Sequence, residues 1–179
     1  MPPFRMSRET LLPLLAAHVL EYGLANASLR PLAKAAGTSD RMLLYHFGNK
    51  DALVAALLEY LARMFADALD TAFPQERAPS RRACAKTVYD ITGRPEFAPF
   101  LRVWWDIVAG CSNDNAAYFD AAGGIMDVLL DWVVDHLPES DPDPQAGARA
   151  VMTVIEGAQM LRAVGRADVG EAGLAALEG

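Results

Sequence analysis

The sequence has few of the residues that build metal centres and disulfide frameworks, with 2 cysteines and 3 histidines among 179 residues. Cys84 and Cys111 are far apart, no Cys-x-x-Cys pair occurs, and no two histidines have a metal-ligand spacing. Disulfide scaffolds and zinc modules need such spacings. We therefore expect free thiols, no metal site and no cofactor.

The sequence also lacks the ~20 consecutive apolar residues that a membrane-spanning helix needs. Its best apolar run, from Leu11 to Leu20, contains Pro13 and His18, and the first residues lack the apolar block of a secretory signal. With 53% apolar and 22% charged residues, the chain has enough material for a packed core. We expect a cytoplasmic protein that makes no membrane contact.

Catalytic motifs are missing from residues 74–179, which contain no Gly-x-Ser-x-Gly, no glycine-rich phosphate loop and no His-x-x-x-His. Asp127, Asp131 and Asp135 recur every four residues and so share one helix face. They could bind a cation, but an acidic face in solvent is the simpler interpretation. We predict no catalytic residues and expect that the protein is not an enzyme.

Apolar residues recur at intervals of three and four, and alternating strand patterns are absent, which predicts an all-α fold of about nine helices. Thr10 is the expected N-cap of the first helix, Pro13 falls in its first turn, and Gly23 ends it. The predicted helices span residues 10–22, 28–36, 39–46, 50–73, 80–93, 96–111, 114–137, 144–165 and 169–178. The first three make a compact trihelical unit.

The predicted helix over residues 50–73 is apolar on two sides. One stripe contains Leu53, Leu57, Leu61, Met64 and Ala68, and the other contains Val54, Leu58, Phe65 and Leu69. A helix that packs on a single core leaves one flank polar. The two stripes therefore predict that this helix lies between two packed bodies.

Charge is distributed unevenly along the chain, whose net charge is −7. Residues 1–50 contain six basic and three acidic side chains, whereas the remainder contains ten basic and twenty acidic ones. A basic end can face phosphates while the acidic bulk limits non-specific binding, although an imbalance in so short a window can also arise by chance.

The segment from Ser28 to Lys50 reads as a helix, a turn at Gly37 and a second short helix. This is the pattern of a helix-turn-helix, whose second helix can enter the major groove of DNA. Leu32, Ala36, Leu43 and Phe47 are placed to bury the inner sides of the two helices. The residues expected on the outer side of the second helix and at its margins are Asp40, Arg41, Met42, Tyr45 and His46.

The run LRPLAKAAGTSDRMLLYHFGNKDAL, from Leu29 to Leu53, resembles the DNA-binding domain of the tetracycline-repressor (TetR) family. The matching positions are Leu32-Ala33, Ala36-Gly37, Ser39, Leu43, His46-Phe47, Lys50, Asp51 and Leu53. Two positions depart from the family pattern, since Arg41 replaces a usual small residue and Leu44 replaces the usual tyrosine. The resemblance implies a helix-turn-helix DNA-binding domain over residues 1–50 and a helical ligand-binding and dimerisation domain over residues 51–179.

The resemblance also implies roles for single residues in DNA binding. Ser28 matches a hydroxyl position that touches phosphate, and Lys50 matches a lysine that meets the backbone at a helix start. Arg41 either pairs with guanine O6 and N7 or contacts phosphate, and Tyr45 and His46 are expected to position the helix on the backbone. For Asp40 a capping role is expected. The DNA-binding candidates are Ser28, Ser39, Arg41, Met42, Tyr45, His46 and Lys50.

Large aromatic residues and adaptable methionines in the second part of the chain could line a cavity for an apolar ligand, or simply pack a core. The ligand-binding candidates are Phe100, Trp104, Cys111, Tyr118, Met126 and Met152. The predicted helix 144–165 is apolar on more than one face, which fits either a dimer interface like that of the family or packing within the chain. The interface candidates are Val151, Ile155, Gly157, Ala158, Leu161 and Leu174.

Together with these candidate residues, the resemblance to the TetR family predicts a ligand-responsive transcriptional regulator. Such a protein, most often a repressor, binds a palindromic operator in double-stranded DNA as a homodimer and is released by a small apolar ligand. The alternative is a helical small-molecule-binding protein, or an adaptor, without DNA binding.

Overall fold

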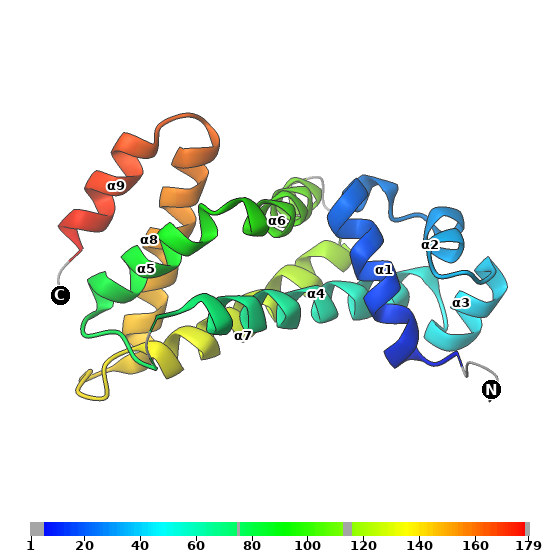
Figure 1. Cartoon of the computed structure of the whole chain (residues 1–179), viewed down its shortest axis with the longest axis horizontal. Helices are drawn as coiled ribbons and strands as arrows, with labels where there is room; N and C mark the ends of the chain where they lie inside the picture. Colours follow the sequence, from blue (N-terminus) through cyan, green and yellow to red (C-terminus); the bar gives the residue numbers. More distant parts are fainter. Residues whose placement is uncertain (1–5, 75, 113–115, 178–179) are drawn as a thin grey trace. The chain divides into compact units, whose positions relative to one another are not determined.

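The computed structural model describes residues 6–74, 76–112 and 116–177, and within them the chain is helical throughout apart from turns and short connections (Figure 1). These residues contain no strand, which confirms the predicted all-α fold. The helices are α1 (Arg8–Tyr22), α2 (Leu29–Ala35), α3 (Asp40–Phe47), α4 (Lys50–Ala72), α5 (Arg81–Thr92), α6 (Ala98–Cys111), α7 (Ala116–His136), α8 (Pro144–Ala163) and α9 (Ala167–Ala176). Two short 3-10 turns, η1 (Leu24–Asn26) and η2 (Pro95–Phe97), precede α2 and α6.

The first helix begins earlier than the sequence pattern predicts. Ser7 is its N-cap, and the Thr10 hydroxyl accepts a hydrogen bond from the Ser7 N–H at 2.9 Å. Thr10 is therefore the third residue of the helix rather than its cap, and Pro13 lies in the helix interior instead of the first turn. Gly23 ends α1 as predicted, with a φ of +82° that favours glycine.

The later helices lie within a few residues of their predicted positions. The largest shifts are of two residues: α6 begins at Ala98 rather than at residue 96, α8 ends at Ala163 rather than at residue 165, and α9 begins at Ala167 rather than at residue 169. The predicted start of the seventh helix at residue 114 and the predicted end of the last at residue 178 lie outside the described residues.

The chain divides into two compact units, of which the first contains residues 1–64 and 98–125. Its core is formed by buried apolar side chains from α1, α2, α3, the first half of α4 and α6. Both stripes of α4 contribute to this single core: Leu53 and Leu57 come from one, and Val54 and Leu58 from the other. The prediction that the two stripes face different bodies is therefore wrong, because the division between units runs across the helix at residue 64.

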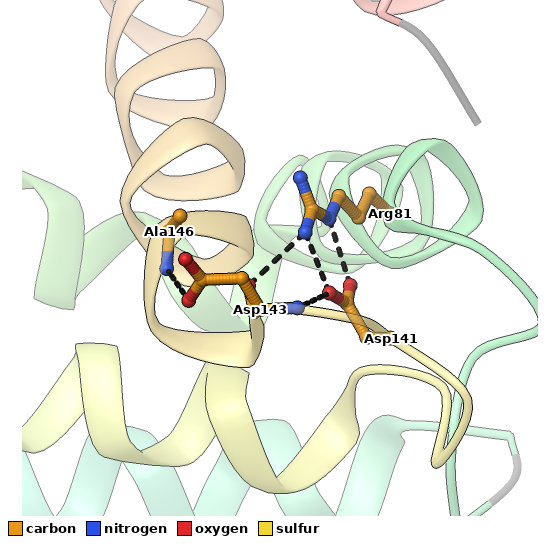
Figure 2. Close-up of polar contacts among 4 residues, drawn as sticks. All are labelled: Arg81, Asp141, Asp143 and Ala146. Carbon is orange, nitrogen blue, oxygen red and sulfur yellow. Dashed lines mark hydrogen bonds and ion pairs between the residues drawn. The ribbon is translucent and has the colours of Figure 1, made fainter.

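The second unit contains residues 65–97 and 126–179, and α8 packs there against both α5 and α9. Gly170 of α9 makes the close approach to α8 possible, since a Cβ on it would lie 3.0 Å from the Ala158 carbonyl oxygen. At the other end of α8, Arg81 of α5 donates two hydrogen bonds to the Asp141 carboxylate, at 2.7 and 2.5 Å (Figure 2). Arg81 also donates to the Asp143 carbonyl, and the Asp143 side chain caps α8 through the Ala146 N–H. This network fixes the α7–α8 connection to the start of α5.

A second contact in this unit joins the ends of α4 and α7. The Asp70 carboxylate accepts a hydrogen bond from the Trp132 indole N–H at 3.2 Å and lies 3.1 Å from Nε2 of His136. The rings of Trp132 and His136 stack with centroids 3.8 Å apart, and Phe73 meets both rings edge-on. These contacts hold the second half of α4 against α7.

We predict that Asp141→Asn lowers the free energy of unfolding by about 2–4 kcal/mol at neutral pH, because it leaves the Arg81 guanidinium without its charged partner. The Arg81 guanidinium lowers the pKa of the Asp141 carboxyl from its usual value. A lowered pKa in the folded state gives stability that is present above the unfolded value, about 3.9, and is lost as the pH falls through the folded value. Urea unfolding between pH 3 and 7 should show a shallower acid loss in the variant.

The matched control is Asp168→Asn, since Asp168 pairs with Arg166 at the surface, where both side chains are more than half exposed. An exposed pair contributes little to stability because water and salt screen it, so this change should have little effect. Equal losses in the two variants would contradict a structural role for the Arg81–Asp141 pair.

Close packing between α6 and α7 in the first unit leads to a second prediction. A Cβ on Gly110 would lie 1.8 Å from Cδ2 of Tyr118, so Gly110→Ala must displace the tyrosine ring. We expect a loss of about 1–3 kcal/mol in thermal or urea unfolding, as for other overpacked cores. Gly124→Ala on α7 has open space around the new methyl and should instead stabilise the helix by up to about 1 kcal/mol. A Gly110→Ala protein as stable as the parent would refute the contact.

Candidate nucleic-acid interface

Two short helices, α2 and α3, form the helix-turn-helix that the sequence predicts. The turn between them contains Gly37 with a φ of +63°, a conformation that glycine adopts without strain. The Ser39 hydroxyl accepts a hydrogen bond from the Met42 N–H at 3.3 Å and so caps α3. Asp40, for which the sequence predicts a capping role, is instead the first residue of the helix. Gly48, with a φ of +91°, ends α3.

The inner sides of these helices are buried. Leu32, Ala33, Leu43 and Phe47 are each at most 2% exposed, and they belong to the core of the first unit. Ala36 is half-buried against the same core. The orientation of α3 is therefore fixed by burial, and its opposite side is left for a partner.

The outer side of α3 presents most of the DNA-binding candidates to solvent. Ser39, Arg41, Met42 and Tyr45 are all exposed, and Tyr45 is the most exposed at 78%. Residues 28–50 contain four basic side chains and one acidic one. The exposed side of α3 therefore combines hydrogen-bonding and apolar groups with the cation of Arg41.

His46 lies at the margin of this side and is half-buried. Its ring meets that of Tyr45 edge-on at 5.3 Å, and its backbone carbonyl accepts a hydrogen bond from the Arg8 guanidinium at 2.6 Å. Arg8 also lies over the Phe47 ring, 5.4 Å from its centroid. The role of Arg8 could not be predicted from the sequence, because this contact joins residues 38 positions apart and leaves no local pattern.

The two remaining candidates lie at helix starts. Ser28 is the exposed N-cap residue of α2, and its hydroxyl makes no capping hydrogen bond. Lys50 is exposed at the first position of α4, where Asn49 caps the helix by accepting from the Ala52 N–H at 2.8 Å. Backbone N–H groups at a helix start favour phosphate, so both positions suit contact with a nucleic-acid backbone.

Two charged residues of α6, which the sequence did not single out, hold the end of α1. The Arg102 guanidinium donates to the carbonyls of Leu20 and Glu21 in the last turn of α1. The Asp106 carboxylate accepts a hydrogen bond from the Leu24 N–H at 3.0 Å. The Arg102 cation interacts favourably with the negative carbonyl end of the α1 dipole. The hydrogen bond from the Leu24 N–H to the Asp106 carboxylate is strengthened by the charge of its acceptor. These contacts join α6 directly to the trihelical part of the first unit.

The ligand-binding candidates are divided between the two units. Phe100, Trp104, Cys111 and Tyr118 are half-buried and pack against the core of the first unit. Burial raises the pKa of the Tyr118 hydroxyl, and the Asp106 carboxylate adds to this effect. Met126 is half-buried and Met152 is buried, both in the second unit.

The interface candidates divide by burial within the second unit. Val151, Ile155, Ala158 and Leu174 are buried inside the single chain, whereas Gly157 and Leu161 are half-buried. A different apolar stripe on α8 is only half-buried and is followed by Val164, which is 67% exposed. An exposed stripe on α9 begins at Val169. The α8 stripe contains Ala150, Val154, Gly157 and Leu161, and the α9 stripe contains Val169, Ala172, Gly173 and Ala176.

Two further features are missing from the described residues. No group of three or more histidine, cysteine, aspartate or glutamate side chains is arranged to hold a metal ion there. Among the helices of the same residues, none is long and apolar enough to cross a membrane.

Comparison with known families gives a match over the helix-turn-helix. Residues 16–57 match the family model described as "Bacterial regulatory proteins, tetR family". The matched segment runs from α1 to the first third of α4 and contains every DNA-binding candidate. None of the curated proteins matches the chain.

Solved structures extend the likeness to the whole fold. A TetR-family transcriptional regulator from Rhodococcus sp. is 21% identical and covers 94% of this chain and 95% of its own, with a TM-score of 0.69. The regulator SCO7518 from Streptomyces coelicolor A3(2) is 22% identical over 92% of this chain and 94% of its own, with a TM-score of 0.68.

The multidrug binding protein EbrR, solved with imidazole, is 20% identical over 88% of this chain and 79% of its own, with a TM-score of 0.63. Residues 16–57 thus match the model of the tetR family of bacterial regulatory proteins, and the described chain has the fold of solved TetR-family regulators.

Proposed function

We propose that this protein is a ligand-responsive transcriptional regulator that binds a palindromic operator as a homodimer and is released by a small apolar ligand. Repression is the expected mode. In functional terms, residues 1–50 bind DNA, and residues 51–179 bind the ligand and form the dimer. The observation that carries the proposal is the exposed outer side of α3, within the segment that matches the TetR family.

Direct reading of bases is assigned to Arg41. Its guanidinium is exposed on the first turn of α3, so it can extend into a major groove that receives the start of this helix. A bidentate contact with guanine O6 and N7 contributes about 1–3 kcal/mol of discrimination. Ser28 and Lys50 flank α3 and suit phosphate contacts that orient the helix. Ser39, Met42, Tyr45 and His46 complete the proposed contact surface.

The proposed ligand site draws on the aromatic residues of α6 and α7. Phe100, Trp104 and Tyr118 offer flat apolar surface, and Cys111 belongs to the same unit. The other two candidates, Met126 and Met152, belong to the second unit. EbrR, whose fold this chain shares, is a multidrug binding protein solved with imidazole and with proflavin. Because Arg102 and Asp106 tie α6 to the end of α1, a ligand that prefers one position of α6 would alter the trihelical unit.

Dimerisation is supported by the half-buried stripe of α8 and the exposed stripe of α9. Gly157 and Gly173 have open space where a Cβ would lie, so a partner helix can approach both positions closely. Exposed Val164 and Val169 would be covered in the same contact. Of the interface candidates, Gly157 and Leu161 can meet a partner directly, whereas Val151, Ile155, Ala158 and Leu174 would support the two helices from beneath.

An adaptor or ligand carrier without DNA binding is the alternative. It offers no reason for the exposed Arg41 and Lys50 beside a capped α3. The two functions differ in salt dependence, because phosphate contacts release counterions and protein contacts need not.

We predict different effects for two substitutions, measured by fluorescence anisotropy with an operator selected from fragments of the source genome. Arg41→Ala should weaken operator binding by about 1–3 kcal/mol and relax the preference at one base pair in each half-site. Lys50→Ala should weaken binding to all sequences similarly, and it should reduce the slope of log K against log[salt] by about one for each phosphate that the lysine neutralises in the parent protein.

Arg63→Ala is the matched control, because Arg63 is an exposed arginine of α4 that pairs with Glu59 at 2.7 Å. It should leave operator affinity unchanged. If Arg41→Ala and Lys50→Ala also left operator affinity unchanged, α3 would not be the helix that contacts the bases of the operator.

For the dimer, we predict that the double substitution Val164→Glu and Val169→Glu produces monomers in analytical ultracentrifugation. Burying unpaired carboxylates in an apolar contact is strongly unfavourable. Ala175→Glu is the matched control, since Ala175 is exposed on the side of α9 that carries Asp168 and Glu171. If the double variant sedimented as a dimer, the contact would involve another surface.

A further inference from the structure

A hollow of about 750 Å³ lies between α1 and α2, within the segment of residues 1–50 that is proposed to bind DNA. It is open to solvent on one side. Its wall consists of Leu14, Ala17, His18, Glu21 and Tyr22 from α1 with Arg30, Pro31, Lys34 and Ala35 from α2. No DNA-binding or ligand-binding candidate is among these residues.

The α1 side of the hollow offers apolar and aromatic surface. Leu14 is 45% exposed and Tyr22 is 55% exposed, although both are large apolar side chains on a helix that otherwise buries its leucines. The rings of His18 and Tyr22 lie 4.8 Å apart and together form an aromatic wall. Exposed apolar side chains that gather in a hollow are typical of binding sites.

The α2 side of the hollow is positively charged. Arg30 and Lys34 are four residues apart, so they project from the same face of α2. Both are exposed, and within the described part of the chain neither forms an ion pair. The acidic Glu21 hydrogen-bonds to the Tyr22 hydroxyl, which raises the pKa of that hydroxyl. The two cations are therefore available to an anion.

His18 contributes its ring to the hollow and not its Nε2 atom. That atom is inaccessible to solvent and has no hydrogen-bond partner among the described residues. A ligand that enters from solvent therefore meets the aromatic surface of His18 and Tyr22 rather than this nitrogen.

We propose that this hollow is a second small-molecule site, which binds an organic anion with a flat apolar body, of the aromatic carboxylate class. The carboxylate pairs with Arg30 and Lys34, and the ring packs between Leu14 and the aromatic surface of Tyr22 and His18. Because the ligand contacts both α1 and α2, it stabilises the helix-turn-helix unit itself. The site is independent of the ligand site proposed for α6 and α7.

The experiment uses the full chain and two matched probes, 1-naphthoate and the neutral 1-naphthalenemethanol. Binding is measured by calorimetry, and contact is located by the methyl NMR signals of Leu14. We expect naphthoate to bind at least about tenfold more tightly than the alcohol, since a charge-assisted pair contributes at least about 1.4 kcal/mol, which is one factor of ten. We expect it to shift the Leu14 signals and raise the melting temperature.

Two variants test the residues. The double change Arg30→Gln and Lys34→Gln should reduce naphthoate affinity at least tenfold, whereas His18→Phe, which keeps an aromatic ring in the wall, should change it by less than about twofold. Arg63→Gln on α4 is the control for loss of an exposed cation elsewhere in the unit and should have no effect.

Three results would overturn the proposal. Equal affinity for naphthoate and the alcohol would remove the role of the cations, and binding without a change at Leu14 would place the anion elsewhere. If naphthoate did not bind the parent protein while the Arg30 and Lys34 double variant lost operator affinity, the cations would serve the DNA backbone. If the α6–α7 residues bound no ligand, or if the protein bound no operator, the naphthoate results would be unchanged. The proposals are therefore tested separately.

Discussion

The proposed DNA-binding surface depends on the burial of a few apolar side chains beneath a very short helix. At eight residues, α3 is well below the length at which an isolated helix is stable in water. Leu43 is fully buried and Phe47 is 2% exposed, so the core of the first unit keeps α3 helical and fixes which side faces outward. The cap at Ser39 and the glycines at 37 and 48 then define where α3 begins and ends.

The same core has a second consequence, because α6 contributes to it. Val103 and Ile107 are buried with the side chains of α1 and α4, and on the same helix Arg102 and Asp106 bind the end of α1. Helix α6 thus contacts the trihelical part through both apolar and charged groups. In the proposed function, a ligand near Phe100 and Trp104 can affect α3 through these contacts of α6. This requires that the ligand binds two arrangements of α6 with different affinity.

Several features were predictable because they depend on residues close together in the sequence. The helix-turn-helix follows from a capping serine, a turn glycine and apolar residues at intervals of three and four, and all of these act within one or two helical turns. The predicted cap at Thr10 is wrong because Ser7 is an equally good cap one turn earlier, and contacts further along the chain decide between them. Arg8 and Arg102 were missed because their partners lie 38 and 82 positions away.

Local patterns in the sequence were sufficient for the all-α class and the approximate helix positions, because these follow from periodicity and capping. The family resemblance of the run from Leu29 to Leu53 was equally local, since it rests on matching residues at fixed spacing. Which apolar faces are covered depends instead on how the helices pack. On α8, Val151 and Ile155 are buried while their neighbours Val154 and Leu161 remain partly uncovered, although all four suit a core equally well. On α4, both stripes enter one core. Which face of a helix becomes buried depends on the helices that pack against it. These contacts join segments that are distant in the sequence, so no local pattern predicts them.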